Sequence, residues 1–200
     1  MVKEAFKRLP IERRTAVMDS AMALYLEKPN DEITIRVLAA HLGVNMATFY
    51  RWFDDKYDLC IEIARFICIK AAPTEPRHIF DEFDTSDVVT KREAEYMTRI
   101  VFCNDELRQR IFFDVDVDVY LPMVKQYLQL ERLDGRLRDN VTDEFVAYLY
   151  VTMEYNLLRF MEYEGIRDMQ LYVKLKDYLL HSLLPHGIMK EKQPLPEKKQ

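Results

Sequence analysis

Residues 34–59 read TIRVLAAHLGVNMATFYRWFDDKYDL, and this stretch predicts a short helix, a tight glycine turn, a second short helix and the start of a third. Thr34 and Asn45 are suited to cap the first and second helices, because their side-chain oxygens can accept hydrogen bonds from backbone N–H groups of the first turn. Gly43 falls at the reversal, where positive φ is easily accommodated. This order of elements is the layout of a helix-turn-helix DNA reader.

The second short helix is predicted to run from Met46 to Phe53. Phe49 and Phe53 are four residues apart, so they share one face and can dock the helix onto a core. The opposite face is expected to point outward with Ala47, Thr48, Arg51 and Trp52. Tyr50 lies at the flank, where its hydroxyl can reach a phosphate. Lys56 begins the next helix, where its ammonium and the backbone N–H groups can hold a phosphate together.

Nine residues of this stretch resemble the signature of the tetracycline-repressor (TetR) family of bacterial transcriptional regulators. They are Thr34, Ala39, Gly43, Val44, Thr48, Tyr50, Phe53, Lys56 and Leu59. The family pattern reads roughly T-x-x-x-I-A-x-x-x-G-V-S-x-x-T-x-Y-x-x-F-x-x-K-x-x-L. The chain departs from it at Leu38 for Ile and at Asn45 for Ser, and Asn caps a helix as well as Ser does. The resemblance covers about the first third of the chain.

The resemblance implies an all-α fold, with an N-terminal three-helix helix-turn-helix DNA-binding domain and a C-terminal helical ligand-binding and dimerisation domain. It assigns phosphate contacts to Thr34, Tyr50 and Lys56, and positions at or near base edges to Arg36, Asn45, Met46, Ala47, Thr48 and Trp52. Arg51 can reach either the backbone or a guanine. The implied activity is that of a homodimeric repressor on a near-palindromic operator, released by a small, mostly apolar ligand.

Composition describes a folded, non-membrane chain. Of the 200 residues, 49% are hydrophobic and 32% are charged, which is ample for a core and unlike a disordered protein. No apolar run reaches the roughly 20 residues that span a bilayer, and no secretory signal begins the chain, so a cytoplasmic location is expected. The net charge is −5, yet residues 1–72 hold eleven basic and ten acidic residues, so the acidity lies in the remainder.

Catalytic and metal-binding patterns do not occur in the sequence. The three cysteines have no CxxC spacing, the four histidines form no HxxxH pair, and four glycines leave no phosphate-binding loop. We therefore expect neither an enzyme nor a metal or cofactor site.

Two domains and a tail are predicted: residues 1–72 as the DNA-binding domain, 73–190 as the helical effector-binding and dimerisation domain, and 191–200 as a disordered tail. Residues 1–8 are expected to form a loose arm, and residues 72–86 a proline-containing linker. The helix after the helix-turn-helix is expected from near Asp55 to about Ala71. Later helices are expected over residues 87–113 with a break near 104–106, from Pro122 to about Leu133, from Thr142 to Glu164 with Gly165 closing it, and from Asp168 to Leu184 with Pro185 closing the last.

Aromatic residues crowd the second domain and offer candidates for a ligand pocket and a dimer interface. The candidate pocket residues are Phe102, Phe113, Tyr120, Tyr127, Asn156 and Arg159. The candidate dimer residues, on apolar stripes of the two final helices, are Tyr148, Leu149, Phe160, Leu171, Leu175 and Leu179. Ordinary helix core explains many of these aromatics equally well, and pairing at the interface would equally explain Asn156 and Arg159.

Two other readings remain compatible with the sequence. One is a helical adaptor that binds protein, because an outward Arg51 and Trp52 would suit a protein partner as well as DNA. The other is a TetR-like activator, or a regulator without a small-molecule effector. Neither the operator nor the effector is specified by the sequence.

Overall fold

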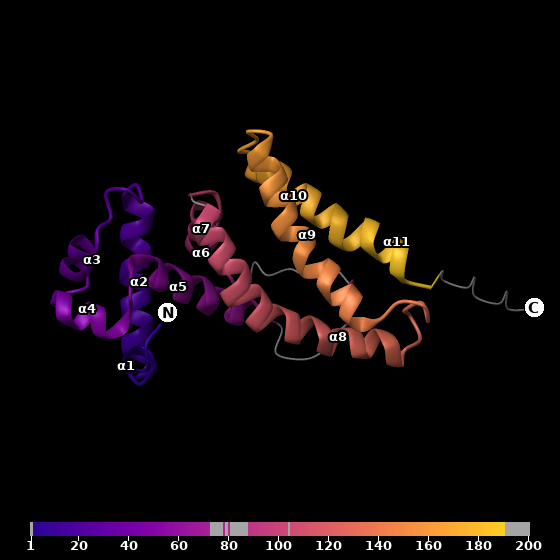
Figure 1. Cartoon of the computed structure of the whole chain (residues 1–200), viewed down its shortest axis with the longest axis horizontal. Helices are drawn as coiled ribbons and strands as arrows, with labels where there is room; N and C mark the ends of the chain where they lie inside the picture. The colour runs from indigo at the N-terminus through magenta and orange to yellow at the C-terminus, as the bar shows by residue number, and fades with distance from the viewer. Residues whose placement is uncertain (1, 73–77, 79, 81–87, 104, 191–200) are drawn as a thin grey trace, which may run out of the picture. The chain divides into compact units, whose positions relative to one another are not determined.

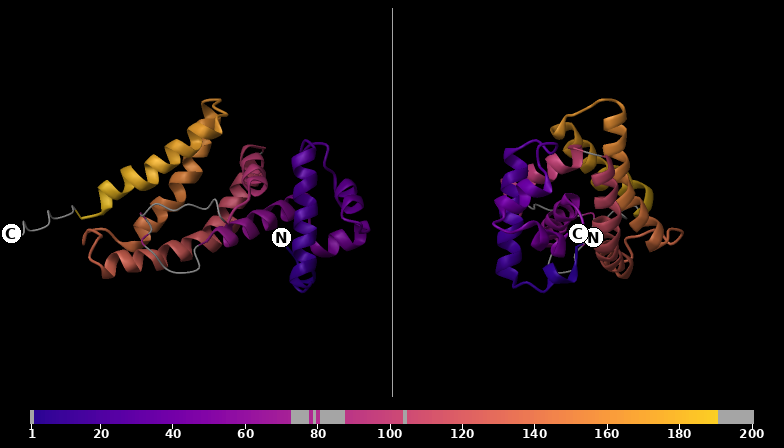
Figure 2. Two further views of the ribbon diagram at one scale, coloured as in Figure 1. Left: turned by 180° about the vertical axis from the view of Figure 1, so that it is seen from behind. Right: turned by 60° about the vertical axis from the view of Figure 1, so that its left-hand side comes forward.

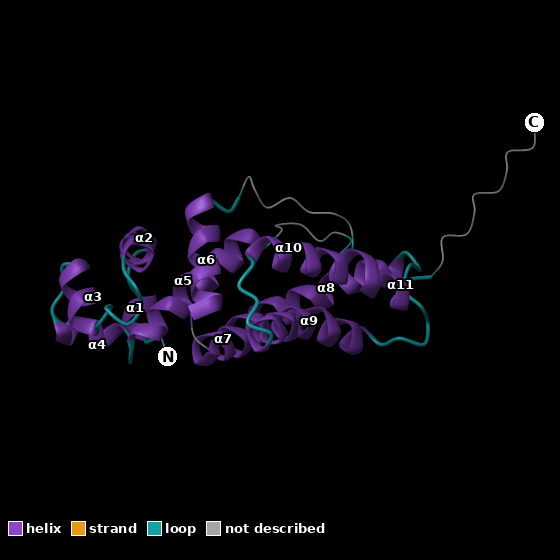
Figure 3. Ribbon diagram, turned by 90° about the horizontal axis from the view of Figure 1, so that it is seen from above, coloured by secondary structure: helices purple, strands orange, loops and turns teal. Residues whose placement is uncertain are grey.

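The computed structural model describes residues 2–72, 78, 80, 88–103 and 105–190, and no strand occurs among them (Figures 1 and 3). The elements are α1 (Glu4–Lys7), α2 (Ile11–Glu27), α3 (Ile35–His41), α4 (Met46–Trp52), α5 (Lys56–Ala71), α6 (Lys91–Cys103), α7 (Asp105–Ile111), the π-helical η1 (Phe112–Tyr120), α8 (Leu121–Leu133), α9 (Asp143–Tyr163), α10 (Met169–Tyr178), the π-helical η2 (Leu179–Leu183) and α11 (Leu184–Ile188). The predicted all-α fold class is confirmed. In the described part of the chain, no helix is both long and apolar enough to cross a membrane.

The chain divides into two compact units. Unit 1 comprises residues 1–73 and 84–120, and unit 2 comprises residues 74–83 and 121–200. Compact packing thus groups residues 84–120 with the N-terminal helices. The division into functional domains at 72/73, and the disordered tail, stay predictions; most of the expected linker and residues 191–200 lie outside the described residues.

Unit 1 is built around α5, whose residues Leu59, Ile63 and Ala64 are almost completely buried. Helices α2, α6, α7 and η1 all contact α5, while α3 and α4 contact each other. The predicted helix that follows the helix-turn-helix is therefore confirmed as Lys56–Ala71, and it forms the centre of the unit.

Two parts of the expected helix pattern are wrong. Residues 2–8 are no loose arm, because Glu4–Lys7 form α1 and Phe6 is completely buried. Pro122 and Pro185 do not begin and end helices as expected, since helical structure runs through both. Pro122 is the second residue of α8 and Pro185 is the second residue of α11, so the turn that precedes each proline lies in a π-helical segment, η1 or η2. The wider π-helical turn relieves the clash of the proline ring with that turn.

Unit 2 consists of α8, α9 and the continuous helical run of α10, η2 and α11, with α9 contacting both of the others (Figure 2). The predicted signals at the ends of α9 are confirmed. Thr142 caps it by accepting from Phe145 N at 3.3 Å, and Gly165 follows it with φ +69°. Asp168 caps α10 through the backbone N–H groups of the first turn. A buried core that includes Val124, Leu128 and Val146 joins these helices.

Candidate DNA-binding interface

Three successive side-chain caps shape the helix-turn-helix. Thr34 Oγ1 accepts from Val37 N at 3.2 Å, and Asn45 Oδ1 accepts from Thr48 N at 2.7 Å. Asp55 Oδ1 accepts from Asp58 N at 2.8 Å. Each cap satisfies a backbone donor that the first helical turn leaves unpaired, so the starts of α3, α4 and α5 are defined by their own sequence. The two caps predicted at Thr34 and Asn45 are confirmed.

The turn between α3 and α4 is a Schellman motif. Val44 N donates to Ala39 O at 2.9 Å and Gly43 N donates to Ala40 O at 3.1 Å, which pairs the last carbonyls of α3. Gly43 has φ +64°, a conformation that side-chain-bearing residues rarely adopt. The predicted glycine turn is confirmed.

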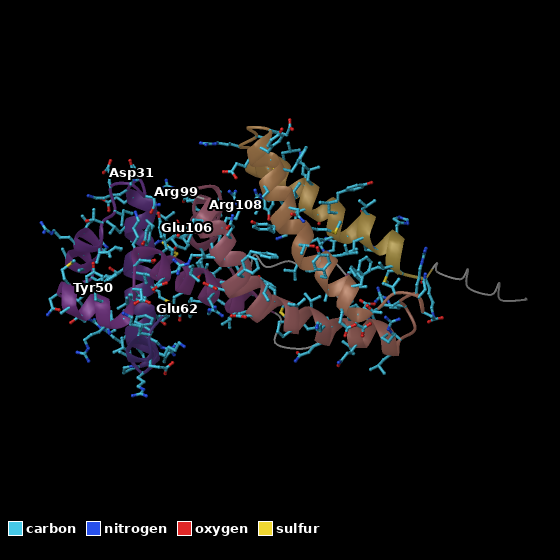
Figure 4. All side chains as sticks on the ribbon, viewed as in Figure 1. Asp31, Tyr50, Glu62, Arg99, Glu106 and Arg108 are labelled. Atoms are coloured by element: carbon cyan, nitrogen blue, oxygen red, sulfur yellow. The ribbon has the colours of Figure 1, made fainter. Side chains whose placement is uncertain are left out.

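The outward surface of α4 matches most of the prediction. Asn45, Ala47 and Arg51 are exposed, and Thr48 is half-buried. Met46 and Tyr50 keep 39% and 45% of their surface accessible (Figure 4 labels Tyr50). Thr34 and Arg36 at the start of α3 are exposed as well. We call these exposed and half-buried residues of α4 and its cap, together with Thr34 and Arg36 at the start of α3, the reading face. Phe49 and Phe53 are completely buried, so the predicted docking face is confirmed.

Trp52 is the exception, and its expected outward position is wrong. It is only 7% exposed and lies on the same face as Phe49, three residues earlier. Its ring centroid is 5.8 Å from that of Phe6, which also contacts Phe53 at 4.7 Å. The helical residues 4–7 supply the packing partner that a loose arm would have lacked. Trp52 therefore anchors α4 instead of facing a base, and the outward Arg51–Trp52 pair on which the adaptor reading depended is absent.

Lys56 also has a different environment from the one expected. Its ammonium donates to the carbonyls of Asn30 and Ile33, at 2.6 and 3.0 Å, in the loop between α2 and α3. The carbonyl of Lys56 in turn accepts from the Tyr25 hydroxyl at 3.0 Å. The ammonium is thus engaged within the protein, where it ties the α2–α3 loop to the start of α5.

Lys3 is a contributor that the sequence analysis missed. Its ammonium donates to Tyr50 O at 2.7 Å and pairs with Asp54 Oδ1 at 2.6 Å, and its backbone N–H donates to Trp52 O at 2.9 Å. A cation at the C-terminal end of a helix is favourable, because the carbonyl end of the helix carries partial negative charge. Lys3 therefore fixes the end of α4, a role that only the three-dimensional course of residues 2–8 reveals.

An ion-pair cluster holds the junction between α4 and α5. Arg110 of α7 contacts Asp55 at 3.2 Å and also binds Asp58, whose side chain is 1% exposed. Asp58 Oδ2 accepts from Asp54 N at 2.7 Å. Burial opposes ionisation of Asp58, but the hydrogen bonds from Asp54 N–H and Arg110 prevail and lower its pKa. We call Asp55, Asp58 and Arg110 the junction cluster. It links α7 to the start of α5, shortly after the end of α4.

The candidate ligand residues do not come together in one site. Tyr120 packs against the core of unit 1 and Tyr127 lies in the core of unit 2. Phe113 is 61% exposed, Asn156 and Arg159 are exposed on α9, and the side chain of Phe102 lies outside the described residues. Helical periodicity alone cannot separate an aromatic residue that fills a core from one that lines a pocket.

The candidate dimer residues separate into two groups. Tyr148 and Phe160 are 58% and 56% exposed on α9, whereas Leu149, Leu171, Leu175 and Leu179 are half-buried. Further exposed hydrophobic residues on the last helices are Phe145, Tyr163, Val173, Tyr178 and Leu183. A concentration of exposed aromatic and aliphatic side chains on two helices is typical of an interaction surface.

Comparisons with known proteins agree with this geometry. The pattern of the family described as "Bacterial regulatory proteins, tetR family" matches residues 17–63. An HTH-type transcriptional regulator of Staphylococcus aureus (strain bovine RF122 / ET3-1) is 29% identical over 97 residues, which are 48% of this chain and 52% of that protein. The chain thus spans about half the length of the curated relatives it matches.

Among solved structures, the fold is similar to that of SmeT, the repressor of the Stenotrophomonas maltophilia multidrug efflux pump SmeDEF. The two share 17% identity with a TM-score of 0.56, over 96% of each chain. A SmeT–triclosan complex gives a TM-score of 0.54 at 18% identity, over 93% of this chain and 100% of that one. At this level of identity the likeness concerns the fold. The matched region contains the capped helices, the Schellman turn and the reading face, and in this domain the chain is similar to the TetR family of bacterial transcriptional regulators.

Proposed function

We propose that this protein is a homodimeric transcriptional repressor whose two α4 helices enter successive major grooves of a near-palindromic operator. The observation that carries the proposal is the reading face, whose residues are exposed or half-buried on α4 and at the start of α3, while Phe49, Trp52 and Phe53 on the other side of α4 are buried. Half-sites about one helical turn apart follow from placing two such helices in adjacent grooves.

Roles on DNA follow from the chemistry of the exposed groups. Thr34 and the Tyr50 hydroxyl are suited to phosphate oxygens, and Arg51 to a phosphate or to the O6 and N7 acceptors of guanine. Met46 and Ala47 can contact thymine methyl groups but cannot form the bidentate hydrogen bonds that identify a base. Specificity would then depend on Arg36, Asn45, Arg51 and DNA shape.

Dimerisation would use the exposed hydrophobic surface of α9 and α10. A second copy of the chain, related by a two-fold axis, would bring Tyr148 and Phe160 against the same helices of its partner and form an intermolecular four-helix bundle. The two-fold symmetry of such a dimer is what a near-palindromic operator requires.

Release by a small ligand is the remaining part of the proposal. SmeT is described as the repressor of a multidrug efflux pump, and it has been solved in complex with triclosan, a small molecule. By analogy, we propose that a small, mostly apolar ligand lowers the operator affinity of this protein. A ligand can do so only by binding better to the DNA-free conformation than to the DNA-bound one.

The proposal is tested with an operator fragment placed upstream of a reporter gene. Expression of the protein should lower reporter output, whereas an activator would raise it. Binding of the purified protein to the same fragment should weaken steeply as salt rises, because phosphate contacts release counterions. Salt-independent binding or an unaffected reporter would contradict the proposal.

A further inference from the structure

A small cavity of about 80 Å³ lies within unit 1, where the end of α2 meets α5, α6 and α7. Its lining residues are Tyr25, Lys28, Pro29, Asn30, Cys60, Tyr96, Arg99 and Leu107. None of them belongs to the candidate pocket predicted from sequence. For scale, an apolar cavity of roughly 150 Å³ binds benzene, so this one holds part of a six-membered ring without rearrangement.

The interior of the cavity is aromatic and uncharged. The rings of Tyr25 and Tyr96 lie 6.0 Å apart in an edge-to-face arrangement, and Leu107 is 2% exposed. Both tyrosine hydroxyls donate to backbone carbonyls of α5, Tyr25 to Lys56 O at 3.0 Å and Tyr96 to Cys60 O at 3.3 Å. Burial raises the pKa of the Cys60 thiol to about 12, so it stays protonated. Such walls favour a neutral ring and disfavour a charged group.

The cations that line the cavity are Lys28 and Arg99, and no carboxylate lines it within the described residues. Two negative contributions oppose these cations. The C-terminal end of α2 carries about half a negative charge. The exposed Glu95 lies 3.5 Å from Arg99, and an exposed ion pair of this kind has a small interaction energy. Two full positive charges outweigh these contributions. An anionic substituent on a ring would therefore be stabilised next to Lys28 and Arg99.

Arg99 connects this cavity to the DNA-binding helices. Its guanidinium donates to the carbonyls of Tyr25 and Leu26 in the last turn of α2 (Figure 4 labels Arg99). The loop that begins there leads to α3, and Lys56 holds the same loop through Asn30 and Ile33. Any group that competes for Arg99 thus acts on the segment that positions the helix-turn-helix.

We propose that this cavity binds a small monocyclic aromatic carboxylate, with the ring against the walls formed by Tyr25 and Tyr96 and the carboxylate on Arg99 and Lys28. Because the cavity is smaller than a complete ring requires, binding favours a conformation in which Arg99 has left the α2 carbonyls and the last turn of α2 has moved outward. We expect the bound carboxylate to lower the affinity of the protein for its operator, and this part rests on the proposed repressor function. Binding of the carboxylate to the cavity does not depend on that function.

Calorimetric titration of the full chain with benzoate tests the site, and benzamide serves as the neutral isostere. Benzoate should bind at least about tenfold more tightly than benzamide, because only benzoate gains the charged contacts. Arg99→Gln should remove this preference, and Arg99→Lys should restore part of it. Arg92→Gln is the matched control, since Arg92 also lies on α6 and donates to an α2 carbonyl, Asp19 O at 3.2 Å, but does not line the cavity.

Three results would overturn the site: no binding of benzoate up to about 10 mM, equal binding of benzoate and benzamide, or a benzoate affinity that Arg99→Gln leaves unchanged. Each variant is first checked for an unchanged circular dichroism spectrum. Repeating the titrations with operator fragment present separates the two proposals. Normal operator binding without a benzoate response would reject this site alone, while benzoate binding without any DNA binding would reject the repressor function alone.

Discussion

Tyr50 is the residue for which the reading face makes the sharpest prediction. Its side chain is 45% exposed, so a Tyr50→Phe change leaves packing intact and removes only the hydroxyl. Loss of one hydrogen bond to a charged phosphate should weaken operator binding by about tenfold. Fluorescence anisotropy measures this, with Tyr163→Phe, an exposed tyrosine of unit 2, as the control. Equal affinities of the two variants would remove Tyr50 from the phosphate contacts.

Lys56 yields a different prediction from the one its sequence position suggests. Lys56→Ala should lower the stability of the protein by about 2 kcal/mol, because two charged hydrogen bonds to Asn30 and Ile33 carbonyls are lost. Thermal denaturation tests this, with the exposed Lys174→Ala as the control. If the melting temperature stayed constant while operator affinity fell, Lys56 would be a phosphate ligand after all.

At the scale of elements, the junction cluster predicts how stability depends on acid. The pKa of Asp58 is lowered from 3.8 in the folded protein, so the unfolded chain binds its proton first as the pH falls. The stabilisation by Asp58 is then complete above about pH 3.8, its pKa in the unfolded chain, and is lost as the pH falls through the lower pKa of the folded protein. Asp58→Asn should reduce stability at neutral pH and flatten this acid dependence. Parallel curves for the variant and the wild type, measured by denaturation between pH 3 and 7, would refute the role of Asp58.

The apolar surface of α9 predicts the effect of a new charge. Phe160→Glu should convert the dimer to a monomer while each chain stays folded, because Phe160 is 56% exposed in the single chain. Leu133→Glu supplies the control, since Leu133 is 82% exposed but lies at the end of α8, outside the proposed interface. Light scattering that reports the same mass for both variants would place the interface elsewhere.

Local signals in the sequence predicted the helix ends well, both in the helix-turn-helix and at α9. Thr34, Asn45 and Thr142 cap helices, and Gly43 and Gly165 end them, because capping and positive φ depend on a few adjacent residues. The two proline predictions failed for a related reason. Pro122 and Pro185 would end an ordinary α-helix, but a wider helical turn precedes each, and sequence rules do not anticipate that turn.

The orientations of the Trp52 and Lys56 side chains were predicted wrongly, because they depend on contacts with segments that are distant in the sequence. Trp52 is buried because Phe6, 46 positions earlier, packs against it, and Lys56 turns inward because the α2–α3 loop offers two carbonyls. Neither partner is visible in a local pattern. For the same reason, the sequence analysis missed Lys3 and the cavity at Arg99.

For the whole molecule, the similarity of residues 17–63 to the TetR family and the reading face support one proposed account, a two-fold dimer that presents two α4 helices to DNA. The acidic balance of residues 73–200 suits this account, since repulsion from the duplex would favour approach by the nearly neutral N-terminal part. In this account, the junction cluster joins α7 to the start of α5, and Arg99 joins α6 to the last turn of α2; α2 and α5 are the helices that precede and follow α3 and α4 in the chain.

The most direct test is a selection of genomic fragments of the host by the purified protein at fixed salt, followed by sequencing of the retained DNA. The account predicts a shared near-palindrome whose half-sites lie about one helical turn apart, and its loss from the retained pool when Arg51→Ala replaces the wild type. Retention of fragments without a common sequence, or an unchanged pool with the variant, would contradict the claim that α4 reads DNA.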